Sequence, residues 1–485
     1  MKIYLLNAPY KPRFTRDMRW QDTGRGGTLY YPIWLAYATG MLEQVGYEAR
    51  LVDTAAWGWN MEQVLKDIEN FQPDLAVIDT SFPSLNNDIS VAEIIKQKLS
   101  DARTVMVGAP ASQFAEKMLS SHGIDMVARW EFDFVLRDLV EAIDEGKSLD
   151  QVKGISYKSG AKIIHNPDRE PSNSEDLDKI PFVSQVYRKH LNVKDYMLNY
   201  SYSMHPEVQI FTGRGCPFRC TFCSWPQTLM GRIHRTRSVP NVLDEFEWVE
   251  KEFKEVKQIF VEDDTFTLNR KYVMEFCQGY KERGLKIPWG GQARVGLDYE
   301  TMRAMKEVNC MMLDIGYESG NNEILRNVKK GITVEQIRSF AKEARKTGLS
   351  MHGNWIIGLP GETKETIKAT ERLIKETKAD AITVAVITPF PGTELYNWAK
   401  ENGYLITEDP NEYLDERGHQ KSIISYPGLS SVEIREAVDG ILKGYYLSPS
   451  YVPIALKRIF NRHGLNELKV LWRSAVAFLK YISNK

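Results

Sequence analysis

The sequence of 485 residues has no cysteine before Cys216. It has only five cysteines in all, and five is an odd number. A secreted disulfide framework would use paired cysteines, so this count favours metal binding or catalysis. No signal peptide is recognisable either, because the apolar stretch at Ile3–Leu6 is too short and no small-residue cleavage site comes after it. We therefore expect a cytoplasmic protein.

The chain also lacks an excess of either charge. Its formal net charge is -1, which removes the broad attraction that supplies most non-specific nucleic-acid binding, so we expect no nucleic-acid partner. With 43% hydrophobic and 26% charged residues it has the composition of a globular protein with a sizeable core. At roughly 150 residues per domain, its length predicts two or three domains.

Residues 1–145 alternate short apolar runs with segments of helical periodicity. This alternation predicts an α/β fold in which a parallel sheet is doubly wound, as in Rossmann-like domains. Residues 146–205 change character: they contain a hairpin pattern around Ser159-Gly160 and a polar run, and we interpret them as a connector. The five expected strands of the first domain are Ile3–Leu6, Ala49–Val52, Leu75–Ile78, Thr104–Val107 and Met126–Ala128.

A second alternating series occupies residues 206–410 and predicts six β/α units, which form a partial (β/α)6 barrel of the TIM type. One helix is expected after Ser238, and another begins at the capping box formed by Thr333 and Gln336. Ligands bind at the carboxyl ends of parallel strands, so the loops after these strands should carry the chemistry. The expected strands are Val208–Thr212, Gln258–Val261, Trp289–Arg294, Leu313–Gly316, Met351–Ile357 and Ala381–Thr388.

Residues 411–485 lack the alternation and are expected to form a helical C-terminal extension, ending in an apolar helix over Leu468–Ile482. Lys469, Arg473 and Lys480 make this helix a poor transmembrane span. It can lie on a membrane surface as a peripheral contact, or it can dock on the barrel with its basic face in water; we favour docking.

Three cysteines stand in a CxxxCxxC loop directly after the first barrel strand: Cys216, Cys220 and Cys223. Thiolates are soft ligands that suit iron–sulfur clusters or zinc. A structural zinc site needs four protein ligands, and the spare Cys277 and Cys310 lie on a predicted helix and just ahead of a later strand. Three ligands leave a coordination position open for a small molecule. A zinc site or a passive redox centre remains the alternative.

This loop, with Phe222 before its last cysteine, resembles the signature of the radical S-adenosylmethionine (SAM) superfamily, and the resemblance spans about residues 208–400. It implies a [4Fe-4S] cluster on the three cysteines, SAM bound at its open iron, and an oxygen-sensitive enzyme that cleaves SAM to a 5'-deoxyadenosyl radical. It also implies that the backbone near Phe222 faces the adenine. An external electron donor such as a flavodoxin or a ferredoxin is expected as a partner.

The later strand ends carry further candidates for SAM binding by the same resemblance. Glu262 and Asp263 come after the second strand near the expected amino group, with helix capping as the alternative. Glu318 and Ser319 stand in a GxES-like element, and Gly358 and Pro360 form a GxP-like turn beside the adenine. Arg294 ends the third strand and either binds a carboxylate or forms a structural ion pair. The basic run of Arg232, His234, Arg235 and Arg237 either contacts an anion or forms a solvated loop, which we favour.

A doubly wound domain ahead of such a barrel resembles the cobalamin-binding subclass, through the segment Tyr31–Tyr37, then Gly46-Tyr47 and Asp53. The resemblance implies cobalamin as a third cofactor. The chain departs from the pattern: it has no DxHxxG, so no histidine ligand to cobalt is expected, and Gly108-Ala109 and Glu131–Asp133 stand where the subclass has its GG and GExE elements. A domain kept only for substrate binding or packing is the alternative.

Within this subclass the chain resembles hopanoid-associated radical SAM proteins and, more distantly, anaerobic magnesium-protoporphyrin monomethyl ester cyclases. The resemblance implies radical ring contraction or rearrangement of a small-molecule or lipid-linked substrate such as a hopanoid side chain. Cobalamin-dependent methyl transfer, oxidative cyclisation and a non-catalytic zinc or iron–sulfur module are the alternatives. Methylthiotransferases are excluded, because they need N-terminal cysteines. The segments that carry the resemblance are Cys223–Thr228, Arg235–Ser238, Asp263–Thr267, Gly316–Asn321 and Ser425–Pro427.

Overall fold

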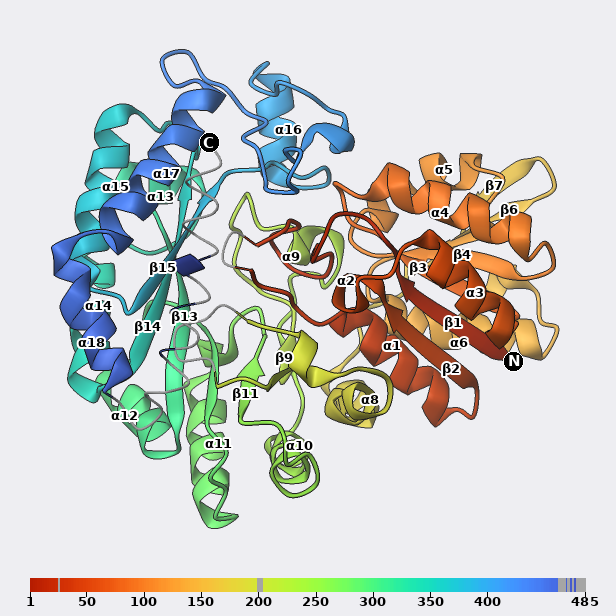
Figure 1. The fold of residues 1–485 in the computed structure, drawn as a ribbon, viewed down its shortest axis with the longest axis horizontal. Helices are drawn as coiled ribbons and strands as arrows, with labels where there is room; N and C mark the ends of the chain where they lie inside the picture. The colour runs from red at the N-terminus through yellow and green to blue at the C-terminus, as the bar shows by residue number, and fades with distance from the viewer. Residues whose placement is uncertain (25–26, 199–203, 461–467, 469–471, 473–474, 477–485) are drawn as a thin grey trace.

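The computed structural model describes residues 1–485 except 25–26, 199–203, 461–467, 469–471, 473–474 and 477–485. Two sheets lie side by side, the first formed by the N-terminal part of the chain and the second by its middle part (Figure 1). One continuous group of buried apolar side chains runs through both, because residues such as Leu35 of the first part and Val208 of the second belong to the same core.

The first sheet has the strand order β2-β1-β3-β4-β5-β6-β7. Strands β1 to β5 are parallel, as predicted for a doubly wound domain. The order reverses at β1, and the crevice outside its carboxyl end is where such sheets receive ligands. The strands are β1 (Lys2–Asn7), β2 (Glu48–Asp53), β3 (Leu75–Asp79), β4 (Arg103–Val107), β5 (Met126–Ala128), β6 (Ile155–Ser159) and β7 (Lys162–His165).

Helices cover both faces of this sheet, and alternate residues of β1 show the period of two that this requires. Ile3 and Leu5 pack with the helices on one face, whereas Tyr4 and Leu6 pack with those on the other. The first face carries α1 (Ile33–Gln44) and α6 (Phe132–Asp144); the second carries α3 (Met61–Phe71), α4 (Leu85–Lys98) and α5 (Ala111–Ser120).

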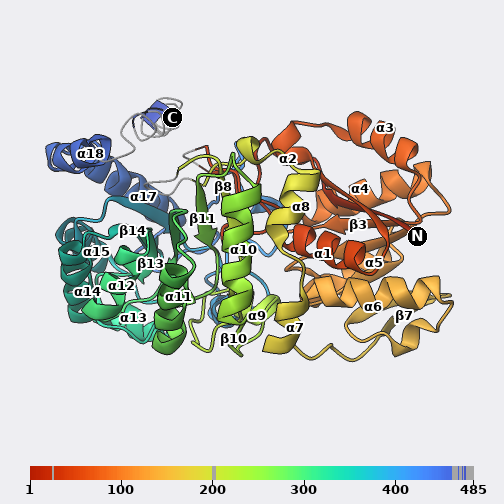
Figure 2. The same cartoon turned by 90° about the horizontal axis from the view of Figure 1, so that it is seen from below.

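The connector predicted over residues 146–205 starts later in the structure than the sequence indicated. The hairpin of β6 and β7 pairs with β5 in antiparallel fashion and so completes the first sheet. The link between the sheets contains α7 (Ser174–Lys179) and α8 (Val183–His190), of which α8 packs against α1 between the two sheets (Figure 2). Sequence alone did not reveal this pairing because a short hairpin looks the same whether or not it joins a sheet.

The second sheet is open and parallel, with the order β15-β14-β13-β12-β11-β8, which confirms the partial barrel. Both predicted helix starts are present: the Ser238 hydroxyl accepts the Asn241 N–H, and Thr333 and Gln336 form both bonds of a capping box. The strands are β8 (Glu207–Ile210), β11 (Gln258–Val261), β12 (Trp289–Ala293), β13 (Cys310–Glu318), β14 (Ser350–Ile357) and β15 (Ala381–Val386). The main helices are α10 (Val239–Glu252), α11 (Arg270–Glu282), α12 (Tyr299–Glu307), α14 (Val334–Thr347) and α15 (Lys364–Thr377).

Among the described residues, the first α-helix of the C-terminal extension begins at residue 431. Helix α17 (Ser431–Tyr446) packs against β14, β15 and α15, and α18 (Val452–Ile459) comes after it. The predicted helix over 468–482 lies almost entirely outside the described residues. Within the part of the chain that is described, no helix is both long and apolar enough to cross a membrane.

Candidate functional site

The cysteine loop is held at the carboxyl end of β8 by a short antiparallel pair, β9 (Gly213–Arg214) and β10 (Arg235–Thr236). Gly215 comes next with a φ of 78°, and a Cβ there would lie 2.2 Å from the carbonyl oxygen of Ile233, so only glycine fits. Side-chain bonds fix the loop further on: Gln227 donates to the Cys223 carbonyl at 2.7 Å, and Arg232 donates to the Phe218 carbonyl at 2.6 Å. The loop is thus held in place by its own flanks.

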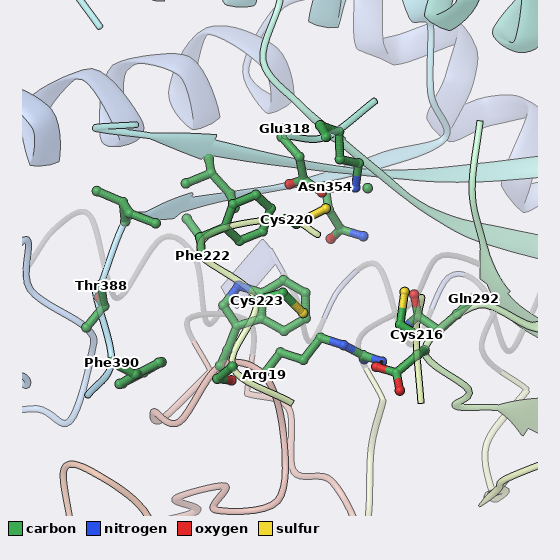
Figure 3. A pocket seen from close by; sticks show the side chains of 18 of the residues that line it. Arg19, Cys216, Cys220, Phe222, Cys223, Gln292, Glu318, Asn354, Thr388 and Phe390 are labelled. Carbon is green, nitrogen blue, oxygen red and sulfur yellow. Dashed lines mark hydrogen bonds and ion pairs between the residues drawn. The ribbon is translucent and has the colours of Figure 1, made fainter. Parts of the chain in front are cut away.

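Cys216, Cys220 and Cys223 line a single cavity of about 160 Å³ at the carboxyl end of the second sheet (Figure 3). They do so at separate positions: among the described residues, no three Cys, His, Asp or Glu side chains converge closely enough to hold a single metal ion. Three thiols on the wall of one cavity are a donor set that suits an iron–sulfur cluster.

No fourth thiol reaches the cavity from the described part of the chain. Cys277 is buried on α11, and Cys310 begins β13, so it lies at the opposite end of the strand from the cavity-lining Gly316 and Glu318. Among the described residues, the three thiols of the loop are therefore the ones that line this cavity.

The protein surroundings favour the neutral thiol form of two of these cysteines. Burial, followed by the nearby Asp264 carboxylate, raises the pKa of Cys216 and of Cys223 above the ordinary thiol value, while Arg19 lowers that of Cys223 in part. Since the thiolate is the form that binds metal, iron ions would supply the charge that holds these side chains deprotonated.

Three of the predicted SAM-binding residues line the cavity: Phe222, Arg294 and Glu318. Glu318 has a positive φ of 66° and pairs with Lys330 at 2.5 Å. The Arg294 guanidinium lies 3.7 Å from the ring centroid of Phe218, and its buried Nη2 has no hydrogen-bond partner among the described residues. The structural ion pair that was the alternative for Arg294 is not formed within the described part of the chain.

Glu262 and Asp263 stand behind the cavity wall. Glu262 accepts hydrogen bonds from Gln209 at 3.0 Å and Gln292 at 3.3 Å. Asp263 accepts the Thr212 N–H at 2.6 Å, and burial raises the pKa of Asp263 to about 7. The neighbouring Asp264 is the acid of this trio that lines the cavity.

Ser319, Gly358 and Pro360 lie beside the cavity, outside its lining. The Ser319 hydroxyl lies 3.4 Å from that of Thr370, and the Gly358 N–H donates to Glu362. The Pro360 carbonyl accepts from Asn327 at 2.9 Å. These residues shape the turns after β13 and β14.

The prediction that the basic run over residues 232–237 forms a solvated loop is wrong for two of its side chains. Arg235 is buried and pairs with Glu131 of the first domain at 2.5 Å. Arg237 is buried as well and pairs with Glu245 of α10 at 2.6 Å. Both arginines are committed to protein partners, so neither is available to an anionic ligand.

Several lining residues carried no recognised sequence signal. Arg19 and Trp20 come from the loop between β1 and α1, and Phe390 and Gln420 come from beyond β15. Other missed residues are polar positions within apolar strands, namely Gln292 and Asn354, together with Lys330. An amide inside an apolar strand is a signal that could have found the first two.

The crevice of the first domain is filled by the chain itself. Arg16 enters it, pairing with Asp88 at 2.7 Å and donating to Asn7 at the end of β1 at 2.6 Å. Asp17 accepts the Trp34 N–H at 3.0 Å and lies against Asp79 at the end of β3, and burial raises the pKa of both carboxyls. Both oxygens of Asp79 have no hydrogen-bond donor among the described groups, so the pair is best satisfied by one shared proton. As they stand, these residues do not fit a ligand tail inserted between β1 and β3.

Comparisons with known proteins agree with this architecture. Residues 210–374 match the radical SAM superfamily, and residues 23–140 match the B12 binding domain. An uncharacterized methyltransferase of Pyrococcus horikoshii is 30% identical over 467 residues, which cover 96% of both chains. The chain belongs to the radical SAM superfamily.

Two more distant proteins match most of this chain. The cytidylyl-2-hydroxyethylphosphonate methyltransferase of Streptomyces wedmorensis is 26% identical over 82% of this chain and 83% of its own. The solved structure of the radical SAM methyltransferase TsrM from Kitasatospora setae is 17% identical, covers 93% of this chain and 90% of that chain, and has a TM-score of 0.68, which supports the fold.

Membership confirms the expected enzyme class and cofactors of this radical SAM protein. The cluster and SAM belong to the superfamily, and cobalamin belongs to the family of the first domain. The cavity fits the first two, because it brings three thiols together with the buried Arg294 Nη2, which no described group satisfies. The first-domain crevice would receive a cobalamin tail only if Arg16 and Asp17 left it.

Proposed function

We propose that this radical SAM enzyme is a cobalamin-dependent methyltransferase that acts on a small polar substrate. The observation that carries the proposal is the common cavity of the three cysteines and the polar strand-end side chains Arg294, Glu318 and Asn354. The relatives of Pyrococcus horikoshii and Streptomyces wedmorensis are both named methyltransferases, which supports methyl transfer over the ring contraction that the sequence suggested.

In this proposal Cys216, Cys220 and Cys223 hold the cluster, which, when bound, supplies the single electron that reductive cleavage of SAM requires. An external electron donor, of the flavodoxin or ferredoxin kind, would reduce it. Arg294 would bind the SAM carboxylate, because its Nη2 lies buried without a partner among the described residues and a carboxylate would satisfy it.

Glu318 would orient the SAM amino group or ribose, since its carboxylate faces the cavity and is held there by Lys330. Phe222 would contact the adenine from the cysteine loop. The residues behind the wall, Glu262 and Asp263, would act by fixing the ends of β8 and β11, and Ser319, Gly358 and Pro360 by fixing the turns around the adenine.

The lining of the cavity is mixed, and apolar side chains such as Ile356 and Val386 contribute more of its surface than polar ones do. Charged and amide side chains also occur around it, including Arg19 and Gln420, so a substrate needs polar groups to pair with them, because a buried polar group left unpaired is costly. Ring contraction of a hopanoid side chain is the second candidate, and it rests on the sequence resemblance alone. It would need a lipid-linked substrate. Such a substrate would suit the peripheral membrane contact suggested by the sequence.

The experiment is anaerobic turnover of the full chain, reconstituted with iron, sulfide and cobalamin, with SAM carrying a deuterated methyl group and a panel of polar metabolites. Radical methyl transfer yields S-adenosylhomocysteine from the SAM that gives up its methyl group, 5'-deoxyadenosine from the SAM that is reductively cleaved, and a product heavier by the labelled methyl group. Ring rearrangement or cyclisation yields 5'-deoxyadenosine and no gained methyl. A chain that holds the cluster but leaves SAM intact with every reductant would be a non-catalytic module, and the proposal would fail.

A further inference from the structure

Arg19 is a first-domain residue that completes the wall of the barrel cavity. It lies in the loop between β1 and α1, and this loop reaches across to α9 (Trp225–Thr228), the helix that comes directly after the cysteine loop (Figure 1). Its side chain lines the same cavity as the three cysteines and is only 17% exposed.

The guanidinium of Arg19 is held by two acids of the barrel. Its Nη1 lies 3.2 Å from Glu262 and its Nη2 lies 3.2 Å from Asp264, both directly after β11. It also donates to the Asp263 carbonyl at 3.3 Å. Figure 3 shows the side chain running toward the part of the cavity that holds Cys216.

A further contact joins Arg19 to the cysteine loop. The guanidinium carbon lies 4.0 Å from the centroid of the Trp225 ring, and Trp225 is the second residue after Cys223. A flat cation stacked on an aromatic ring in a desolvated setting is held firmly. The positive charge is therefore fixed close to the thiols, and it offsets the charges of Asp264 and Glu262 there.

We propose that Arg19 is a positioning residue, supplied by the first domain, that sets the reduction potential of the cluster on Cys216, Cys220 and Cys223. The potential of an iron–sulfur cluster depends on the charge and hydrogen bonding around it. An added electron is stabilised by a nearby cation and opposed by nearby carboxylates. Arg19 raises the potential by its own positive charge, which partly offsets the charges of Glu262 and Asp264 beside the cluster.

The inference rests on the cluster site of the proposed function, and it is tested by redox titration of the reconstituted full chain without SAM or substrate, followed by electron paramagnetic resonance. We expect Arg19→Met to lower the midpoint potential and Asp264→Asn to raise it, because these variants remove opposite charges. Arg19→Lys, which keeps the charge, should stay closer to the wild type than Arg19→Met. Arg137→Met, which removes a first-domain arginine paired with Asp138, is the matched control and should leave the potential unchanged.

Two results would overturn the inference: equal midpoint potentials for the wild type and Arg19→Met at equal iron content, or shifts of the same sign for Arg19→Met and Asp264→Asn. If Arg19→Met alone does not hold iron, the double variant Arg19→Met/Asp264→Asn decides. It removes one charge of each sign, and its potential should lie below that of Asp264→Asn. Failure of the proposed function would be distinguishable, because the wild-type chain would then leave SAM intact in the turnover assay while its cluster kept the same midpoint potential.

Discussion

The guanidinium of Arg214, two residues before the first cluster cysteine, lies 2.6 Å from the carboxylate of Asp133 in the first domain. Both side chains are almost wholly buried, and Arg214 also stacks over Trp34 with 4.9 Å between guanidinium carbon and ring centroid. Asp133 belongs to the stretch that stands where the cobalamin-binding subclass has its GExE element. Here it ties the cysteine loop to the first domain, as the neighbouring Glu131 does through Arg235.

Breaking this ion pair should destabilise the protein strongly. Asp133→Asn removes the shorter of the two ion pairs of buried Arg214 and leaves only Glu131, at 3.4 Å, as its counter-ion. Loss of one partner of a buried pair costs up to about 3–5 kcal/mol. We expect a clear fall in the thermal unfolding midpoint and weaker cluster retention. The control Asp138→Asn breaks half-exposed pairs with Arg137 and Arg169, and its effect should stay below about 1 kcal/mol for each pair. Equal midpoints for the two variants would contradict this account of the interface.

Replacing a proposed cluster ligand should lower the iron content far more than replacing any other cysteine. Alanine at Cys216, Cys220 or Cys223 removes one of three thiolates, and we expect each variant to lose most of its iron after anaerobic reconstitution. Cys277→Ala should retain iron at the wild-type level, because Cys277 is buried on α11 away from the cavity. Iron analysis and the visible absorption of the cluster measure both. Iron retention by Cys220→Ala would show that the ligand set is misassigned.

Glu318 offers a test of SAM binding apart from turnover. Glu318→Gln removes a charge that faces the cavity and weakens the hold of Lys330. A hydrogen bond to a charged group contributes about 1.5–3 kcal/mol, so the dissociation constant for SAM should rise roughly 10-fold to 100-fold. Anaerobic calorimetric titration of the reconstituted chain gives the constant. Glu323→Gln, on the exposed face of the next helix, is the control and should bind SAM as the wild type does.

The sequence predicted the elements that local pattern determines, and it missed those created by distant contacts. Periodicity predicted both sheets, and the cysteine spacing marked the loop after β8 whose three thiols line one cavity. Arg19 carries no local signal for its role, because its partners Glu262 and Asp264 lie more than two hundred residues away in the chain. The motif resemblance likewise marked Asp263 as a cavity residue, but only the fold determines which of three successive acids turns inward, and that residue is Asp264.

Glu362 should make stability depend on pH. Burial raises the pKa of Glu362 to about 8, although its carboxylate accepts the N–H groups of Gly358 and Leu359. The folded state therefore binds this proton more tightly than the unfolded state. The resulting stability is fully present below the ordinary carboxyl pKa and is lost as the pH rises through about 8.

Glu362→Gln accepts the same two N–H groups without a charge, so the variant should lose less stability than the wild type between pH 5 and pH 8. Urea unfolding at several pH values in this window measures the difference. The exposed Glu436→Gln is the control and should behave as the wild type does. If the unfolding free energies of the wild type and Glu362→Gln changed with pH in the same way, a group other than Glu362 would be responsible for the pH dependence.

Cobalamin binding should respond to the residues that fill the first-domain crevice. Arg16 and Asp88 pair there with almost no exposed side-chain surface, and any tail entering between β1 and β3 has to displace Arg16. The double variant Arg16→Met/Asp88→Asn removes both charges of this ion pair together, so neither of the two is left buried without the other. We expect it to take up cobalamin faster than the wild type, as measured by corrinoid absorbance on mixing. Arg50→Met, which breaks a half-exposed pair with Asp67, should leave uptake unchanged. Uptake by the double variant at the wild-type rate would mean that cobalamin binds without opening this crevice, and therefore against a different surface of the first domain.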